Sequence, residues 1–103
     1  MNFEYKGRSG IITGASSGVG RVIAQTLGAA GMELWLVGRS ATELELTAEA
    51  IEVAGGPKAH CISMDISGRG ELAALVNEVG ETHSNLFALV NNAGVMYPEP
   101  VIE

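Results

Sequence analysis

Cysteine is almost missing from this 103-residue sequence, which contains Cys61 and no second thiol. A single cysteine excludes an internal disulfide and a cysteine metal cluster. The sequence also lacks a long hydrophobic run, since its longest apolar stretches, LWLV and LFALV, are too short to cross a bilayer. Its first ten residues contain no hydrophobic segment of the signal-peptide type. We therefore expect a cytoplasmic protein without a membrane partner.

Basic residues are scarce as well, with six Lys and Arg against twelve Asp and Glu and a net charge of −6. This balance repels nucleic-acid backbones, and no basic cluster offsets it, so we expect no nucleic-acid partner. The two histidines have no acidic neighbours at ligand spacing, which argues against a metal site. We expect His60, Cys61, Met32 and Trp35 to be packing residues. With hydrophobic residues at 47%, the chain can form a globular core.

Short apolar runs alternate with amphipathic segments along the whole chain. Strands are predicted over 10–13, 33–37, 59–64 and 86–90. Helices are predicted over 18–30, from Ser40 to the GGP at 55–57, and from Ser67 through Val79. Ser40 and Glu43 have the spacing of a capping box. Apolar strands separated by helices predict a parallel sheet covered on both faces, as in half of a doubly wound α/β fold.

The first predicted turn carries the segment TGASSGVG, Thr13 to Gly20, with three glycines in eight residues. A glycine-rich turn between a strand and a helix is typical of anion binding, because free N–H groups and the helix dipole favour negative charge there. The spacing Gly14-x-x-x-Gly18-x-Gly20 is neither G-x-G-x-x-G nor a P-loop. From the glycine spacing alone, an ordinary tight turn remains an alternative.

TGASSGVG resembles the cofactor loop of the short-chain dehydrogenase/reductase family, Thr-Gly-x-x-x-Gly-x-Gly. The segment NNAG at 91–94 resembles that family's second signature, which follows its fourth strand. The resemblance covers the whole chain and implies that residues 1–103 are the N-terminal, NAD(P)-binding part of a Rossmann-type domain. The implied sheet is a doubly wound parallel sheet, truncated to four strands in the order 3-2-1-4 with three helices.

The resemblance also implies which positions contact the cofactor. The loop glycines would line the pyrophosphate, and the loop serines would donate hydrogen bonds to phosphate or ribose. Asp65 matches the position that binds the adenine amino group, although a turn or cap residue is the alternative. Ile66 would flank the adenine ring, and the NNAG segment would lie beside the nicotinamide ribose. Together with the end of the second strand, the implied cofactor-binding set is Gly14, Ser16, Ser17, Gly18, Val19, Gly20, Arg39, Ser40, Asp65, Ile66, Asn91, Ala93 and Gly94.

The end of the second predicted strand favours NADP over NAD. Gly38 stands where NAD-preferring members of the family carry Asp, and it leaves room for a 2′-phosphate. The guanidinium of Arg39 can pair with that phosphate, and Ser40 can add a hydroxyl donor. A solvated surface charge is the alternative for Arg39. One departure from the pattern is Ser17, where some NADP-preferring members carry a basic residue.

The family's proton-transfer pair, Tyr-x-x-x-Lys, has no match in this sequence, because Ser9 and Val101 lie four residues beyond its two tyrosines. No catalytic residue is therefore assigned. The resemblance implies an NADP(H)-dependent oxidoreductase for alcohol/carbonyl pairs, present here as its cofactor-binding half and inactive alone. The alternative is a non-catalytic nucleotide-binding or assembly module. We expect the chain to form a homo-oligomer through its exposed fourth strand or the surface of the missing half.

Overall fold

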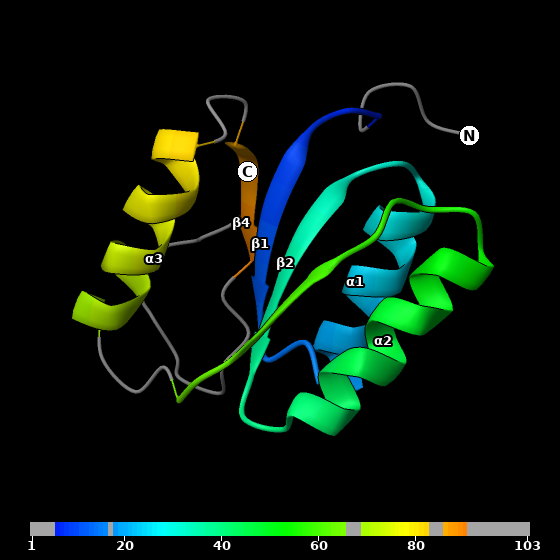
Figure 1. The fold of residues 1–103 in the computed structure, drawn as a ribbon, viewed down its shortest axis with the longest axis horizontal. Helices are drawn as coiled ribbons and strands as arrows, with labels where there is room; N and C mark the ends of the chain where they lie inside the picture. The colour runs from blue at the N-terminus through cyan, green and yellow to red at the C-terminus, as the bar shows by residue number, and fades with distance from the viewer. Residues whose placement is uncertain (1–5, 17, 66–68, 83–85, 91–103) are drawn as a thin grey trace.

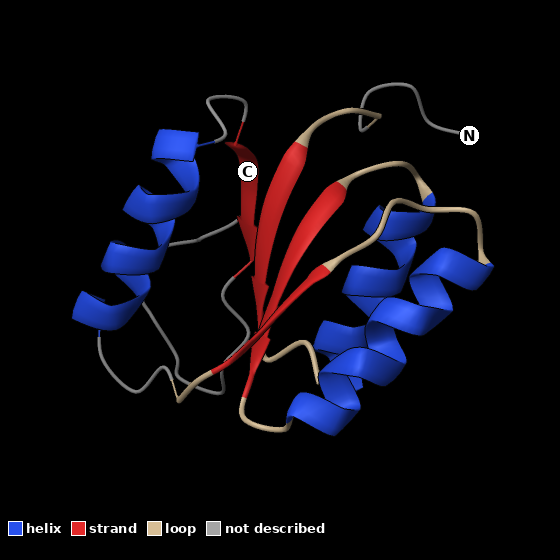
Figure 2. Ribbon diagram, in the orientation of Figure 1, coloured by secondary structure: helices blue, strands red, loops and turns tan. Residues whose placement is uncertain are grey.

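A computed structural model describes residues 6–16, 18–65, 69–82 and 86–90. Four strands and three helices alternate along these residues (Figures 1 and 2). In chain order they are β1 Ser9–Thr13, α1 Gly18–Ala29, β2 Glu33–Gly38, α2 Ala41–Val53, β3 His60–Ser63, α3 Arg69–Thr82 and β4 Leu86–Val90. The α/β alternation predicted from the sequence is thus confirmed, including its three helices.

The strands form one parallel sheet in the order β3-β2-β1-β4. Ile11 of β1 lies opposite Trp35 of β2, which lies opposite His60 of β3. Because all strands run in the same direction, the segments that follow them emerge at one edge, which we call the carboxyl edge. The turns after β1, β2 and β3 therefore lie side by side there.

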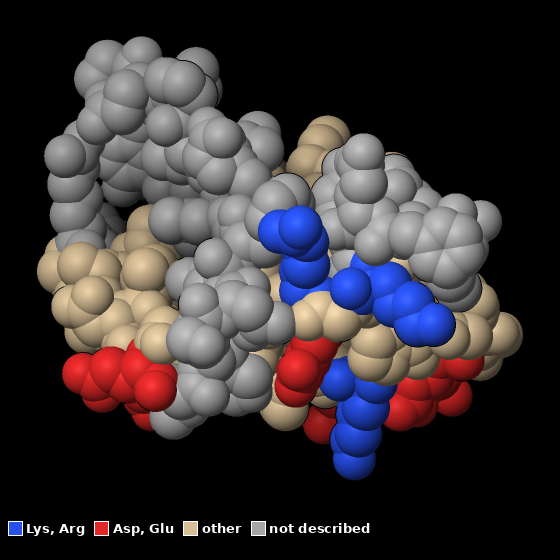
Figure 3. Space-filling view, turned by 90° about the horizontal axis from the view of Figure 1, so that it is seen from above, with Lys and Arg blue, Asp and Glu red and all other residues tan. Residues whose placement is uncertain are grey.

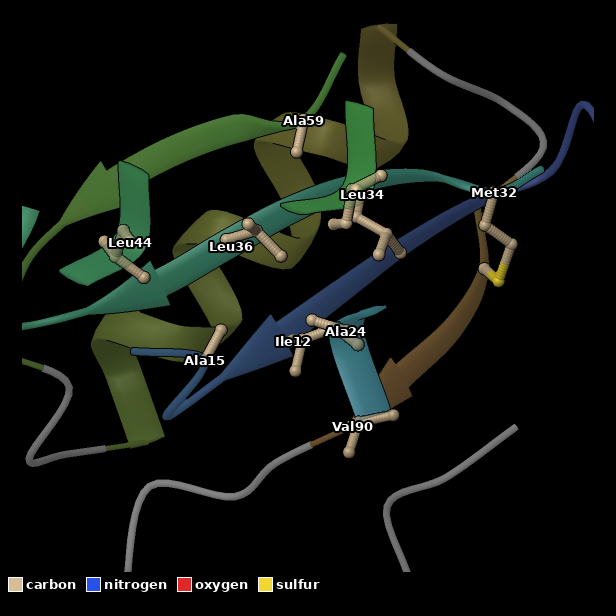
Figure 4. Packing of buried hydrophobic residues seen from close by; sticks show 10 residues of the cluster. Ile12, Ala15, Ala24, Met32, Leu34, Leu36, Leu44, Ala59 and Val90 are labelled. Atoms are coloured by element: carbon tan, nitrogen blue, oxygen red, sulfur yellow. The ribbon is translucent and has the colours of Figure 1, made fainter. Parts of the chain in front are cut away.

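Helices cover the sheet on both faces, with α1 and α2 on one side and α3 on the other (Figure 1). Side chains alternate between the faces along each strand. Ile12, Leu34 and Leu36 belong to the core under α1 and α2, where Figure 4 shows Ala24 and Leu44 approaching them. The core under α3 joins Ile11, Trp35, Val37, Leu75 and Val79. Strands β1 and β2 are thus fixed in register by two separate cores.

The buried face of α1 consists of small residues, Gly20, Ala24 and Gly28. The apolar residues Val19, Ile23, Leu27 and Ala30 recur at helical spacing in the sequence. Of these, Ile23 and Leu27 are partly buried against the core, whereas Val19 is 66% exposed. Small residues bring α1 close to its neighbours. A Cβ atom on Gly28 would lie 2.7 Å from Cγ2 of Ile51 in α2. Backbone proximity therefore decides which face of α1 is buried.

Helix α2 begins as the sequence predicts. Its N-cap is Ser40, whose hydroxyl oxygen accepts a hydrogen bond from the backbone N–H of Glu43 at 3.2 Å. The carboxylate of Glu43 pairs with Arg21 of α1. Leu44, Thr47 and Ile51 form the buried face of α2. The cap thus fixes where α2 starts, and the carboxylate links it to α1.

Strand β3 differs from its prediction as a buried strand. His60 and Cys61 are exposed, because β3 is the edge strand of the sheet formed by the described residues. The ring of His60 stacks on Trp35 with 4.4 Å between the ring centroids, and its Nε2 lies 2.7 Å from a carboxylate oxygen of Glu33. Neither residue is the core residue that the sequence suggested. Trp35 and Met32 are buried, as predicted.

In the part of the chain that the structure describes, no helix combines the length and apolar character needed to cross a membrane. The cytoplasmic location stays a prediction.

Candidate functional site at the carboxyl edge of the sheet

The turn after β1 bends in a way that depends on glycine. Gly14 has a φ of 64° and Gly18 a φ of 61°, in the left-handed region that residues with a Cβ atom rarely adopt. The backbone N–H of Ala15 donates to the carbonyl oxygen of Val37 at 3.1 Å, which ties the turn to β2. Ala15 itself is fully buried. The turn is therefore held at the sheet edge and delivers the chain into α1.

The start of α1 is suited to an anion. Its first turn contains no acidic residue, so the free N–H groups of a helix start meet no negative side chain of their own helix. Gly18 is exposed and a Cβ atom there would meet nothing within 4 Å, which leaves the backbone accessible. Gly20 is buried on the sheet side. Gly18 thus leaves the backbone accessible to a ligand, whereas Gly20 allows α1 to pack closely.

Two polar residues that the sequence analysis missed hold this turn from behind. Arg21 of α1 donates through Nη2 to the carbonyl oxygen of Ser16 and through Nε to the hydroxyl of Thr47 at 3.1 Å. The Thr47 hydroxyl of α2 shares its proton between two carbonyl oxygens, that of Ala15 at 3.1 Å and that of Glu43 at 3.2 Å. Arg21 also pairs with Glu43. Thr47 is fully buried. The signal for it in the sequence is a polar residue on the helix face that Leu44 and Ile51 make apolar, because a buried polar group needs a hydrogen-bond partner.

The end of β2 is tightly packed around Gly38. A Cβ atom on Gly38 would lie 3.1 Å from the Ser16 hydroxyl oxygen and 3.2 Å from Cδ2 of Leu44. A side chain at this position would therefore fit only if Ser16 or Leu44 moved by a few tenths of an ångström. The room for a 2′-phosphate beside Gly38 stays a prediction. Gly38 serves the close approach of the turn to β2.

Arg39 extends from this edge with 83% of its side chain exposed. Its Nε lies 3.6 Å from a carboxylate oxygen of Asp65, which follows β3 and is 62% exposed. The hydroxyl of Ser63 donates to the backbone carbonyl of Arg39 at 3.0 Å. The structure thus brings together Arg39, Ser40 and Asp65 beside the glycine turn. An ion pair this exposed contributes little stability, so Arg39 is available to an anionic ligand.

Other predicted site residues fall outside the described part of the chain. These are Ser17, Ile66, Asn91, Ala93 and Gly94. Val19 lies in the first turn of α1 with its side chain exposed. Thr13 donates from its hydroxyl to the carbonyl oxygen of Val90 at 3.4 Å, which joins the carboxyl ends of β1 and β4.

Positive charge alone does not mark the site. Figure 3 looks onto the opposite edge, where the strands begin, and shows Lys and Arg side chains in the middle of that face. Lys6 and Arg8 precede β1, and Lys58 precedes β3. Arg39 directly follows a strand instead. The carboxyl edge is distinguished by its backbone geometry together with one exposed guanidinium.

A separate groove lies between α2 and β3, lined in part by Glu45, Glu49, Glu52, Lys58 and Cys61. Burial and the nearby carboxylate of Glu45 raise the pKa of the Cys61 thiol above its ordinary value. Three carboxylates make this groove unsuitable for a polyanionic ligand. Within the described ranges, no group of three or more His, Cys, Asp or Glu side chains is placed to hold a metal ion.

Comparison with known proteins gives the same family from sequence and from structure. The model of the short chain dehydrogenase family matches residues 9–103. Among curated proteins, the chain is 32% identical to dehydrogenase/reductase SDR family member 7B of Bos taurus and 30% identical to the 3-oxoacyl-(acyl-carrier-protein) reductase FabG of Aquifex aeolicus. These matches cover 90% and 92% of this chain but only 30% and 38% of the relatives.

Solved structures give a similar result. A metagenomic short-chain oxidoreductase, crystallised in complex with NADP, is 34% identical with a TM-score of 0.78 over 91% of this chain and 46% of its own. Glucose dehydrogenase of Caenorhabditis elegans in its apo form is 29% identical, with a TM-score of 0.76 over 89% of this chain and 40% of its own. The chain thus spans less than half the length of each of these relatives.

Proposed function

Because the chain belongs to the short chain dehydrogenase family, we propose that it is the cofactor-binding part of an NADP(H)-dependent oxidoreductase. The reaction would move hydride between the nicotinamide and an alcohol/carbonyl pair. One observation carries the proposal: the glycine turn, Arg39 and Asp65 follow three neighbouring parallel strands at one edge of the sheet. A dinucleotide binds at such an edge in doubly wound folds. The NADP bound to the metagenomic relative supports the choice of cofactor.

The described residues fit the adenosine half of a dinucleotide. The turn offers two positive-φ glycines and a helix start without acidic side chains, which suits a diphosphate. The exposed guanidinium of Arg39 would pair with a 2′-phosphate. The Ser40 hydroxyl accepts from the Glu43 N–H and keeps its own proton, so it can donate to the same phosphate. Asp65 would accept from the adenine amino group, and Ile66 would flank the ring.

The nicotinamide end is assigned by family resemblance alone. We propose that Asn91, Ala93 and Gly94 lie along the nicotinamide ribose and that Ser17 adds a phosphate contact. When bound, the cofactor supplies the hydride. The printed sequence contains no Tyr-x-x-x-Lys pair, so these 103 residues assign no proton donor, and we expect no turnover from them alone.

We further propose that residues 1–103 form the first half of a doubly wound domain whose order 3-2-1-4 continues beyond β4. Strand β4 pairs with β1 and ends the described sheet, so its outer edge carries backbone groups available for pairing. This supports self-association of the chain through β4. Sedimentation at high concentration tests the point, because a monodisperse monomer would favour the reading as a self-contained nucleotide-binding module.

Calorimetric titration with NADPH, NADH and 2′-phosphoadenosine tests the cofactor assignment. The charge reversal Arg39→Asp should weaken NADPH and 2′-phosphoadenosine by about tenfold or more and change NADH by less than about threefold. Lys58→Asp is the matched control, since it makes the same charge change at the opposite edge. Equal losses of NADPH affinity in Arg39→Asp and Lys58→Asp would mean that the effect comes from net charge and not from contact with Arg39. Equal affinity for all three ligands before and after Arg39→Asp would refute the NADP assignment.

A further inference from the structure

A polar network behind the glycine turn connects three segments that are distant in the sequence. Arg21 from α1 contacts Ser16 of the turn and both Thr47 and Glu43 of α2. Thr47 in turn contacts Ala15. Two consecutive backbone carbonyls of the turn are therefore held by side chains of the two helices that flank it.

The geometry points to Arg21 and Thr47 as positioning residues for the diphosphate site, an inference that rests on the proposed function. In a trans peptide the N–H points away from the C=O of the same peptide group. The Thr47 hydroxyl holds the Ala15 carbonyl toward α2, so the N–H of Ser16 is directed away from α2. Arg21 donates through Nη2 to the next carbonyl oxygen, that of Ser16. Holding the carbonyls orients the donors that an anion needs.

The network can hold the carbonyls of the turn in place because it is largely buried. Thr47 is fully buried, and the Arg21 side chain is only 30% exposed. A hydrogen bond in such surroundings is stronger than one in water, and a partner left alone there is costly. The Glu43 carboxylate balances the guanidinium charge beside the turn. Without that carboxylate, the guanidinium would be free to rotate toward solvent or toward a bound phosphate.

The network also engages most of the Arg21 guanidinium. A guanidinium beside a diphosphate site would be expected to bind phosphate directly, but three of the five N–H donors of Arg21, on Nε and Nη2, are used by Thr47, Ser16 and Glu43. Arg21 therefore acts through the backbone of the turn, whereas Arg39 would act through direct contact with the 2′-phosphate. The two arginines should consequently affect different parts of the ligand.

Calorimetric titration with three ligands separates these roles. ADP has the diphosphate without the 2′-phosphate, 2′-phosphoadenosine has the reverse, and NADPH has both. Arg21→Met should weaken ADP and NADPH by about tenfold and leave 2′-phosphoadenosine within about twofold. Arg39→Met should weaken 2′-phosphoadenosine and NADPH and spare ADP. Thr47→Val, which removes one hydroxyl at nearly constant volume, should follow the pattern of Arg21→Met.

Hydrogen exchange of the Ala15 amide supplies a readout without ligand. This N–H is bonded to Val37, and loosening the turn should raise its exchange rate in Arg21→Met and Thr47→Val by about tenfold. Arg21→Lys, which keeps one charged donor, should restore part of both the affinity and the protection. Equal losses for all three ligands, or unchanged ADP affinity in both variants, would overturn this inference alone. If the unaltered chain binds none of the ligands, the proposed function fails and this inference fails with it.

Discussion

Replacing glycine by alanine at three positions should change the stability of the fold with different signs. Gly80 lies within α3 and a Cβ atom there would meet nothing within 4 Å. Gly80→Ala should therefore stabilise the protein by about 0.5–1 kcal/mol, through higher helix propensity and a less flexible unfolded chain. It serves as the reference for the two other variants.

The contact between α1 and α2 predicts the opposite result at Gly28 and Gly56. In Gly28→Ala the new Cβ atom would overlap three atoms of Ile51, the nearest at 2.7 Å. Overpacking costs about 1–3 kcal/mol and the helix propensity returns about 1, which leaves a net loss of up to about 2 kcal/mol. In Gly56→Ala the nearest atom is the backbone carbonyl oxygen of Gly28 at 2.3 Å. A backbone oxygen cannot rotate away, so the loss should be about 3 kcal/mol.

Urea unfolding measures all three variants, with fluorescence of Trp35 as the probe. Trp35 is the single tryptophan in the sequence and is 7% exposed, so unfolding should change its emission. The slope of the free energy of unfolding against urea should stay constant while the midpoint moves. The expected order of stability is Gly80→Ala, unaltered chain, Gly28→Ala, Gly56→Ala. If Gly56→Ala is as stable as Gly80→Ala, the close approach of the turn after α2 to α1 is wrong.

Three further predictions concern the site and the groove. Cys61 should react with iodoacetamide at pH 8 more slowly than a free thiol, because its raised pKa lowers the thiolate fraction, and Glu45→Gln should speed the reaction. Ser40→Ala should lose about 1 kcal/mol of stability in urea, whereas Ser40→Asp should keep the cap and weaken NADPH relative to NADH in calorimetry. Gly38→Ala should push the Ser16 hydroxyl from its place and weaken ADP binding by severalfold, and unchanged ADP affinity would show that the packing there does not matter.

The features that were predictable from the sequence depend on neighbours in the chain. The glycine spacing of the first turn and the Ser40–Glu43 cap are local patterns, and both occur in the structure at the predicted positions. Strand and helix order followed from apolar periodicity for the same reason. Local chemistry also explains why the boundaries of β1, β2 and α1 moved by only one residue at an end. These elements required no knowledge of tertiary contacts.

Exposure of β3 required knowledge of what lies beside it. The apolar run AHCISM reads as a buried strand, yet His60 and Cys61 are exposed because none of the described strands pairs with the outer edge of β3. The predicted strand order, 3-2-1-4, places β3 at the end of the sheet and so already implies this exposure. His60 instead finds Trp35 and Glu33 on the neighbouring strand. Apolar composition therefore identified the strand, and sheet position decided its burial.

The polar network behind the glycine turn could not be predicted from the sequence, because its partners are far apart along the chain. Thr47 lies 32 residues from Ala15, and Glu43 lies 22 residues from Arg21. A threonine on the apolar face of a predicted helix signals that some buried partner exists, since a buried hydroxyl without one is costly. The sequence does not name that partner. Only the packing of α1 against α2 brings Thr47 and Glu43 to the turn.

Gly38 changes the physical account of how this edge would choose NADP over NAD. In the sequence the glycine stood for space, and in the structure a Cβ atom at this position would lie 3.1 Å from the Ser16 hydroxyl oxygen. Under the proposed function, the choice therefore depends on the donors that follow. Arg39 has Asp65 3.6 Å away, so a 2′-phosphate must compete with a carboxylate for the guanidinium. The pair is exposed and weak, and a phosphate carries more charge and can bind Arg39 through two oxygens, so the competition favours the phosphate.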